Sequence, residues 1–310
     1  MRDKSEYRII FMGTPKIAAK VFEELIKDGF CFVGLIAQED KPVGRKHILE
    51  PVPTKEVALR YNIPVYQPHK IRKEYEFANE LKPDLILTMA YGQIIPQGLI
   101  DIPKYGCLNL HGSLLPKYRG AAPIQRAIMN GEKKTGITLM EMIDKMDAGR
   151  MYAKEEVTIL CEDNYSSLCD KLAIAATKIV KDNLLDYLEG KLPGEIQNEE
   201  EVTFADKITP EEEKLSLDYS CERFINYVRG LSNEPGGYIL VDDKKLKIYR
   251  VSKVSDSHEE LGKITIKKGV FLSLRDGTLE LKELQLEGKK RMDDKSFANG
   301  NHNLDGVIAK

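Results

Sequence analysis

The sequence predicts a protein in two parts: an α/β domain with a mostly parallel sheet, followed by a small β-barrel. In the first half of the chain, short apolar runs alternate with amphipathic segments. This alternation of strand and helix is typical of a parallel sheet. In the last third, several short strand-like runs follow one another with glycines between them. Short strands at close spacing favour a small barrel.

The first part of the chain predicts strands and helices in alternation. The apolar runs expected as strands are 8–12, 32–37, 84–90, 106–111, 136–142 and 149–157. The amphipathic segments expected as helices are 17–28, 54–61, 73–81, 123–130 and 166–190. The last of these ends at Gly190, as helices often do. Uninterrupted apolar runs such as 84–90 fit strands that are covered on both faces.

A change in composition separates the two parts. Residues 191–206 are polar, contain Pro193 and an acidic run at 199–201, and show no hydrophobic period. We therefore expect a domain at 1–190, a linker at 191–206 and a second domain at 207–310. Within the second domain, a helix is expected at 221–231. The strands are expected at 238–241, 246–254, 262–266, 269–274 and 278–286.

The charge balance argues against a protein that binds polyanions non-specifically. The chain has 310 residues with 47 Lys and Arg against 49 Asp and Glu, a formal net charge of −2. Positive charge is nevertheless concentrated locally, at 244–247, 267–268 and 289–291. Such clusters matter more than the total if the barrel contacts phosphate groups.

The composition also indicates the compartment. No stretch approaches the roughly 18 to 20 apolar residues of a membrane-spanning helix, and no signal peptide precedes the first strand. The five cysteines are scattered and lack the CxxC spacing of a zinc site or a redox pair. We therefore expect a cytoplasmic protein without a membrane partner.

Polar residues gather at the end of one predicted strand. Asn109 and His111 lie two residues apart, so their side chains point to the same face. Open α/β sheets bind ligands at the carboxyl ends of their strands, where both residues fall. The Gly-Ser-Leu-Leu-Pro segment 112–116 that follows fits neither a helix nor a strand. It offers main-chain N–H and C=O groups to a flat polar ring.

A carboxylate completes this set of groups. Asp147 begins an Asp-Ala-Gly turn before the next predicted strand. An amide, an imidazole and a carboxylate together can catalyse acyl transfer without a metal or a covalent intermediate. The residues alone leave a second interpretation open, because a single His at a strand end is often only hydrogen-bonded and Asp-x-Gly is often only a turn. A nicotinamide-dependent oxidoreductase is disfavoured, since no GxGxxG motif follows the first strand.

The polar segment resembles a known active site. Residues 109–124, Asn-Leu-His-Gly-Ser-Leu-Leu-Pro-Lys-Tyr-Arg-Gly-Ala-Ala-Pro-Ile, together with Asp147-Ala-Gly149, resemble the motif of the folate-dependent formyltransferases. Weaker similarities follow in the expected order at 11–15, 40–45, 203–208 and 285–292. The last of these stretches is typical of the branch of the family that acts on initiator tRNA, and it distinguishes that branch from shorter relatives.

This resemblance implies a function and a fold. The function is transfer of a formyl group from 10-formyltetrahydrofolate to the α-amino group of methionine on initiator tRNA, for translation initiation. The catalytic residues by similarity are Asn109, His111 and Asp147. The fold is a Rossmann-like formyltransferase domain followed by an OB-like barrel that binds tRNA.

The resemblance also assigns binding residues. Ser113, Leu114, Leu115 and Pro116 line the folate site by similarity. The loop 39–53 is similar to an arm that contacts the tRNA acceptor stem, and its basic residues are Lys41, Arg45 and Lys46. No metal is implied, and we expect a monomer.

Three other functions remain to be distinguished. Glycinamide ribonucleotide transformylase shares the three catalytic residues but would end near residue 200. Sugar N-formyltransferases are the nearest enzymatic alternative and are not expected to carry the stretch 285–292. A non-catalytic RNA-binding protein would have no need for Asn109, His111 and Asp147 together.

Overall fold

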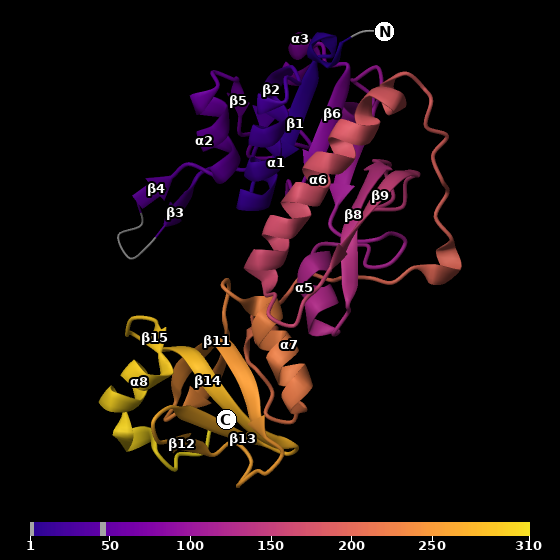
Figure 1. The fold of residues 1–310 in the computed structure, drawn as a ribbon. Coiled ribbons are helices and arrows are strands. Elements are labelled where there is room, and N and C mark those ends of the chain that lie inside the picture. Colours follow the sequence, from indigo (N-terminus) through magenta and orange to yellow (C-terminus); the bar gives the residue numbers. More distant parts are fainter. Residues whose placement is uncertain (1–2, 44–47) are drawn as a thin grey trace. The chain divides into compact units, whose positions relative to one another are not determined.

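The computed structural model describes residues 3–43 and 48–310 (Figure 1). Within this part of the chain, the residues group into two compact units. The first unit is built from residues up to Pro123, with Lys134–Thr158 and Cys169–Ala205. The second is built from Asp206–Lys310, with the two short earlier segments Ile124–Lys133 and Ile159–Leu168.

A single sheet forms the centre of the first unit. In the described residues it has seven strands in the order β5-β2-β1-β6-β7-β8-β9. Pairing is parallel from β5 to β7 and antiparallel for β8 and β9. The strands are β1 (Ile9–Gly13), β2 (Phe32–Ile36), β5 (Val65–Tyr66), β6 (Leu85–Met89), β7 (Cys107–His111), β8 (Lys134–Glu141) and β9 (Met151–Thr158).

Helices and a separate hairpin complete this unit. The hairpin pairs β3 (Lys41–Val43) with β4 (Ile48–Glu50). The helical elements are η1 (Lys4–Glu6), α1 (Lys16–Lys27), α2 (Pro53–Arg60), α3 (Phe77–Leu81), α4 (Gln97–Ile100), most of α6 (Tyr165–Leu188) and η2 (Glu199–Glu201).

The central strands are apolar throughout because both faces of the sheet are covered. In β1, Phe11 points to one face, where its ring stacks on Phe22 of α1 at 4.7 Å. Ile10 and Met12 point to the other face and pack in a second apolar cluster with Leu99 of α4. All five residues of β1 are buried, which explains the uninterrupted apolar run in the sequence.

The second unit is an antiparallel sheet of six strands in the described residues, curved into a half-barrel (Figure 1). Its strand order is β10-β11-β14-β13-β12, with β15 paired to β14. Phe224 and Val228 of α7 belong to its apolar core. The elements are η3 (Glu211–Glu213), α7 (Cys221–Leu231), β10 (Gly237–Val241), β11 (Lys244–Ser255), β12 (Ile264–Ile266), β13 (Val270–Leu274), β14 (Gly277–Leu286), β15 (Met292–Asp293), α8 (Asp294–Gly300) and η4 (His302–Leu304), with α5 (Pro123–Met129) contributed from earlier sequence.

The predicted fold class, a Rossmann-like domain followed by a small barrel, is confirmed. Several short elements were not predicted, because they have too few residues to show a hydrophobic period. In α8 only Phe297 and Ala298 are buried, and the helix starts where Asp293 accepts a hydrogen bond from the Ser296 N–H. The helix expected at 73–81 begins only at Phe77. Among the described helices, none has the length and apolar character needed to cross a membrane.

Candidate active site

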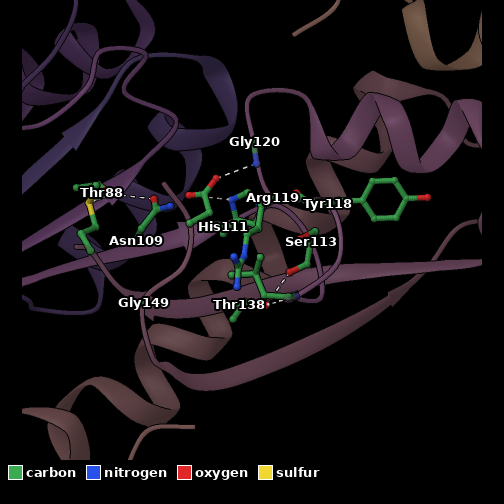
Figure 2. Close-up of polar contacts among 12 residues, drawn as sticks. Thr88, Asn109, His111, Ser113, Tyr118, Arg119, Gly120, Thr138 and Gly149 are labelled. Atoms are coloured by element: carbon green, nitrogen blue, oxygen red, sulfur yellow. Dashed lines mark hydrogen bonds and ion pairs between the residues drawn. The ribbon is translucent and has the colours of Figure 1, made fainter. Parts of the chain in front are cut away.

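The predicted polar residues meet at the carboxyl end of β7. Thr88 of β6 is the register partner of Asn109 in β7, and His111 is the partner of Thr138 in β8. Asn109 is half-buried and His111 is buried with 5% of its surface exposed. Figure 2 shows the side chains of Asn109 and His111 on the same side of the strand, as their spacing predicts.

The amide of Asn109 has a defined orientation. The Thr88 hydroxyl donates its proton to Asn109 Oδ1 at 2.8 Å, and the sulfur of Met142, a weaker acceptor, lies 3.3 Å from the same hydroxyl. Since the amide oxygen is engaged by Thr88, the amide NH₂ group faces the other way. Figure 2 shows it on the side of His111. Asn109 therefore presents a hydrogen-bond donor toward the space beside the imidazole.

The ring of His111 is fixed by a main-chain acceptor. Its Nε2 atom lies 2.9 Å from the carbonyl oxygen of Tyr118. A carbonyl oxygen only accepts hydrogen bonds, so Nε2 carries a proton. The other nitrogen, Nδ1, lies 3.6 Å from Asp147 Oδ1. The structure thus brings the imidazole and the carboxylate together with Nδ1 as the nitrogen between them.

The Asp147 carboxylate is positioned by the backbone of its turn and by a hydrogen bond from Gly120. Its backbone is left-handed, with φ of 49°. Its Oδ2 atom accepts a hydrogen bond of 2.9 Å from the N–H of Gly120, and its side chain is 15% exposed. Gly149 is required two residues later, because a Cβ there would lie 2.0 Å from the Glu141 carbonyl oxygen. The turn that the sequence predicts here therefore positions a carboxylate at the end of β7.

The loop after His111 is attached to β8 through Thr138. The Thr138 hydroxyl donates to the Ser113 carbonyl oxygen at 2.7 Å and accepts from the Leu115 N–H at 3.1 Å. Leu115 is buried against Met140 and Met151. Ser113 is buried and its hydroxyl donates to the Lys117 carbonyl oxygen at 2.6 Å. Pro116 is also buried, and Leu114 is half-buried beside Gly136.

Segment 197–205 supplies contacts that the sequence did not predict. Arg119, with 1% of its surface exposed, donates from Nε to Gln197 Oε1 at 2.9 Å. The Arg119 N–H donates to the Thr203 carbonyl oxygen, and the Ala205 N–H donates to the Arg119 carbonyl oxygen. This segment, expected as part of a linker, therefore lies along the loop that carries Tyr118 and Gly120. The similarity noted at 203–208 was the one sequence signal for it.

The guanidinium of Arg119 also forms an ion pair with the exposed side chain of Glu199. Glu199 accepts from Arg119 Nη2 at 2.8 Å and from Lys145 Nζ at 3.1 Å. These two cations, Arg119 first and Lys145 second, lower the pKa of Glu199 to about 2. Glu199 is therefore a carboxylate at neutral pH, and it balances the charge of the buried guanidinium.

Two buried groups of the first unit are unsuited to acid–base chemistry. Burial, with a smaller contribution from Glu74, raises the pKa of Tyr91 to about 12. Its hydroxyl is the buried side-chain group without a hydrogen-bond partner in the described residues. Burial also raises the pKa of the Cys107 thiol at the start of β7. Both groups stay protonated at neutral pH and cannot act as bases there. The described residues contain no cluster of three or more His, Cys, Asp or Glu that could hold a metal.

Of the basic residues expected to contact tRNA, Lys41 is the one that the structure describes. Lys41 is exposed on β3, where its register partner is Glu50 of β4. Arg45 and Lys46 lie outside the described residues.

Comparison with known proteins identifies the family. The model of the formyl transferase family matches residues 7–184, and the model of the formyl transferase C-terminal domain matches residues 207–302. The chain belongs to the formyl transferase family. The matched formyl transferase region includes β6, β7, β8 and the Asp147 turn.

Similar formyl transferases are known from several bacteria. The methionyl-tRNA formyltransferase of Bacillus subtilis (strain 168) is 44% identical over 301 residues, which is 95% of this chain and 95% of that protein. The methionyl-tRNA formyltransferase of Staphylococcus aureus (strain bovine RF122 / ET3-1) is 40% identical over 303 residues, which is 96% of this chain and 97% of that protein.

Solved structures share the formyl transferase fold. HypX from Aquifex aeolicus in complex with tetrahydrofolic acid matches 95% of this chain with a TM-score of 0.69 and 17% identity. This chain spans about half of HypX, 47% of its length. Methionyl-tRNA formyltransferase from Clostridium thermocellum matches 80% of this chain and 94% of its own, with a TM-score of 0.57 and 20% identity.

Proposed function

We propose that this protein transfers the formyl group of 10-formyltetrahydrofolate to the α-amino group of methionine on initiator tRNA, for translation initiation. The observation that carries the proposal is the approach of Asp147 to His111 Nδ1, at 3.6 Å, beside the oriented amide of Asn109. The substrate follows from the family, because methionyl-tRNA formyltransferases are 40% to 44% identical over nearly the full chain.

Asn109 and His111 stabilise the negative charge that develops during acyl transfer. Bound 10-formyltetrahydrofolate supplies an N-formyl carbon that an amine can attack. The Asn109 NH₂ group, set by Thr88, donates toward the space where the oxygen gains charge. A protonated His111 Nδ1 donates there too, because at 3.6 Å it is not hydrogen-bonded to Asp147 Oδ1. Preorganised donors of this kind are a large source of transition-state stabilisation.

Asp147 has two roles in this proposal. As an anion near His111 Nδ1, it stabilises positive charge on the imidazole. Through a water molecule, it accepts the proton that the attacking amine must lose. The Gly120 N–H on its other oxygen keeps the carboxylate in place for both roles.

The folate is held by the loop of Ser113, Leu114, Leu115 and Pro116. Support comes from the attachment of this loop to Thr138, which holds its main chain in one shape. The side chains of Ser113, Leu115 and Pro116 are buried, so what the loop offers to a flat polar ring is the half-buried Leu114 side chain and the main-chain groups that Thr138 does not engage.

The tRNA is contacted by Lys41, Arg45 and Lys46 and by the C-terminal domain, residues 207–310. Formyl transfer itself is assigned to the first domain, with 191–206 between them. Lysines and arginines bind phosphate groups, so affinity for tRNA falls as the salt concentration rises. The protein acts as a monomer in the cytoplasm, where its tRNA substrate is used.

The decisive experiment offers one donor and two acceptors. The protein is incubated with 10-formyltetrahydrofolate and either methionyl initiator tRNA or nucleotide-linked amino sugars, and the formylated product is identified. Formylation of the tRNA alone is expected. Formylation of the sugars instead would assign the chain to the sugar N-formyltransferases.

An Asn109→Ala variant should lose about 100-fold or more in single-turnover rate, and a folded variant with the wild-type rate would contradict the role of Asn109.

A second experiment tests the proposed tRNA contacts. Arg45→Ala should weaken tRNA binding and lower the slope of log affinity against log salt by about one. The turnover of bound substrate should not change. An Arg45→Ala protein with unchanged affinity and unchanged salt slope would remove Arg45 from the binding surface.

A further inference from the structure

One buried amide connects the loop of His111 to the turn of Asp147. Gln197 is 4% exposed and lies in the segment that follows β9 and α6 in sequence. Its Nε2 atom donates to the Asp147 carbonyl oxygen at 2.8 Å and to the Gly149 carbonyl oxygen at 2.9 Å. Both amide hydrogens of this one side chain are therefore used on the Asp147 turn.

Arg119 sets the orientation of this amide. Its Nε atom lies 2.9 Å from Gln197 Oε1. A guanidinium only donates hydrogen bonds, so the oxygen of the amide must face Arg119 and the nitrogen must face the turn. Arg119 is in turn held by Glu199. The position of the amide is thus determined by groups on both sides of it.

The Asp147 turn needs such support. Asp147 has a φ of 49°, a backbone conformation that residues other than glycine rarely adopt. Its carboxylate contacts two groups from the other side of the site, the Gly120 N–H at 2.9 Å and His111 Nδ1 at 3.6 Å. A small rotation of this turn would move the carboxylate away from His111.

We propose that Gln197 is a positioning residue, which holds the Asp147 turn so that the carboxylate faces His111 Nδ1. This inference rests on the proposed function, in which Asp147 serves catalysis. Gln197 does not touch the substrates in this proposal. Its effect on the rate passes entirely through Asp147.

The test is a double-mutant cycle on formylation kinetics. Gln197→Met keeps the length of the side chain and removes all three hydrogen bonds. We expect kcat to fall about 10- to 100-fold, as a small misplacement of a catalytic group does. The KM for 10-formyltetrahydrofolate and for methionyl-tRNA should stay within about twofold, since Gln197 contacts neither substrate. Ile196→Ala, at an exposed position directly before Gln197, is the control with unchanged kcat.

A second variant separates positioning from general support. Gln197→Glu still accepts the hydrogen bond from Arg119 but has no N–H groups for the two carbonyl oxygens of the turn. Positioning predicts a loss of kcat like that of Gln197→Met, whereas a residue that only holds Arg119 would leave Gln197→Glu active. If Gln197→Met does not fold, as judged by its circular dichroism spectrum, Gln197→Glu decides the question.

The cycle is completed in an Asp147→Asn background. If Gln197 acts through Asp147, adding Gln197→Met to Asp147→Asn should lower kcat by less than about twofold more. Full additivity of the two losses would overturn the inference, and so would wild-type kcat in both Gln197 variants. Wild-type kcat in Asp147→Asn alone would instead contradict the proposed function, because it would remove Asp147 from catalysis.

Discussion

His111 donates the proton on Nε2 to the carbonyl oxygen of Tyr118 across 2.9 Å. This bond gives the two nitrogens of the ring different roles. Nε2 is hydrogen-bonded to the loop that contains Tyr118, while Nδ1 faces Asp147 and is the nitrogen available for proton transfer or hydrogen bonding during catalysis. Substitutions that mimic one nitrogen at a time can therefore separate stability from catalysis.

The first prediction uses this division. His111→Gln places an amide near the position of Nε2 and should keep the bond to the Tyr118 carbonyl oxygen, so its melting temperature should remain close to wild type. Its single-turnover formylation rate should fall about 100-fold or more, because nothing replaces Nδ1. His111→Asn places its amide near Nδ1 and loses the bond to Tyr118, so its melting temperature should fall; its rate should fall too, because an amide cannot carry the positive charge of an imidazolium. His302→Gln, on the exposed η4 helix, serves as control. Equal activity of His111→Gln and wild type would contradict the role of Nδ1.

The second prediction concerns the orientation of Asn109. Thr88→Val removes the hydroxyl that engages Asn109 Oδ1, so the amide is free to turn its NH₂ group away from His111. A hydrogen bond of this kind contributes about 1 kcal/mol, which corresponds to roughly a five- to tenfold lower kcat. The KM values should not change. Thr135→Val, also buried but in β8, should leave kcat unaffected. Equal kcat for the two variants would show that Thr88 does not orient the amide.

The third prediction concerns close packing at Gly149. A Cβ on Gly149 would lie 2.0 Å from the Glu141 carbonyl oxygen, so Gly149→Ala must displace the backbone beside Asp147. We expect it to lower the free energy of unfolding by about 3 kcal/mol and to reduce formylation activity. Gly300→Ala at the end of α8 meets nothing within 4 Å and should be neutral or slightly stabilising. Urea unfolding of both variants provides the measurement.

The fourth prediction concerns the pH dependence of the ion pair outside the site. Arg119 and Lys145 lower the pKa of Glu199 from 4.5 to about 2 in the folded protein. The charged pair therefore stabilises the fold fully above about pH 5, and this contribution is lost as the pH falls from about 4.5 toward 2. Urea midpoints of wild type and Glu199→Gln should differ most at pH 7 and converge at lower pH. Glu200→Gln should show no such trend. A constant difference at every pH would exclude this ionisation as its cause.

Much of the first unit could be predicted because its strands are buried on both faces. The strand expected at 106–111 is β7 at Cys107–His111, and the strand expected at 84–90 is β6 at Leu85–Met89. Strand periodicity alone placed Asn109 and His111 on one face. Asp147 was grouped with them because an amide, an imidazole and a carboxylate together suit acyl transfer, and the similarity to formyltransferases supported that grouping. The structure brings Asp147 to His111. Their catalytic roles stay a prediction.

The contacts of Gln197 and Arg119 could not be predicted in the same way. These residues are 78 positions apart, and side chains that meet across such a distance follow no spacing along the chain. Gln197 stands in a polar stretch without a hydrophobic period, which is typical of a linker. Burial of a glutamine and an arginine depends on mutual hydrogen bonds that only the folded chain shows.

Short elements escaped prediction for a related reason. The pair β3 and β4 has three residues in each strand, and Pro42 in β3 disfavours a strand by its propensity. Helix α5 was expected within the first domain, yet most of it packs in the second unit, where Met129 joins the core of the half-barrel. The hydrophobic pattern along the sequence indicates that such a helix exists, but it does not identify the residues against which the helix packs.

The contacts of segment 197–205 also set an order for the synthesis of the protein. A nascent chain that has just completed α6 at Leu188 already contains Asn109, His111 and Asp147, but it lacks the residues that donate to the Asp147 turn and pair with Arg119. The ribosome must add residues up to Ala205, and release them from its exit tunnel, before these bonds can form. The site is therefore completed only after residue 205 has emerged, before the main segment of the second unit, Asp206–Lys310, has followed.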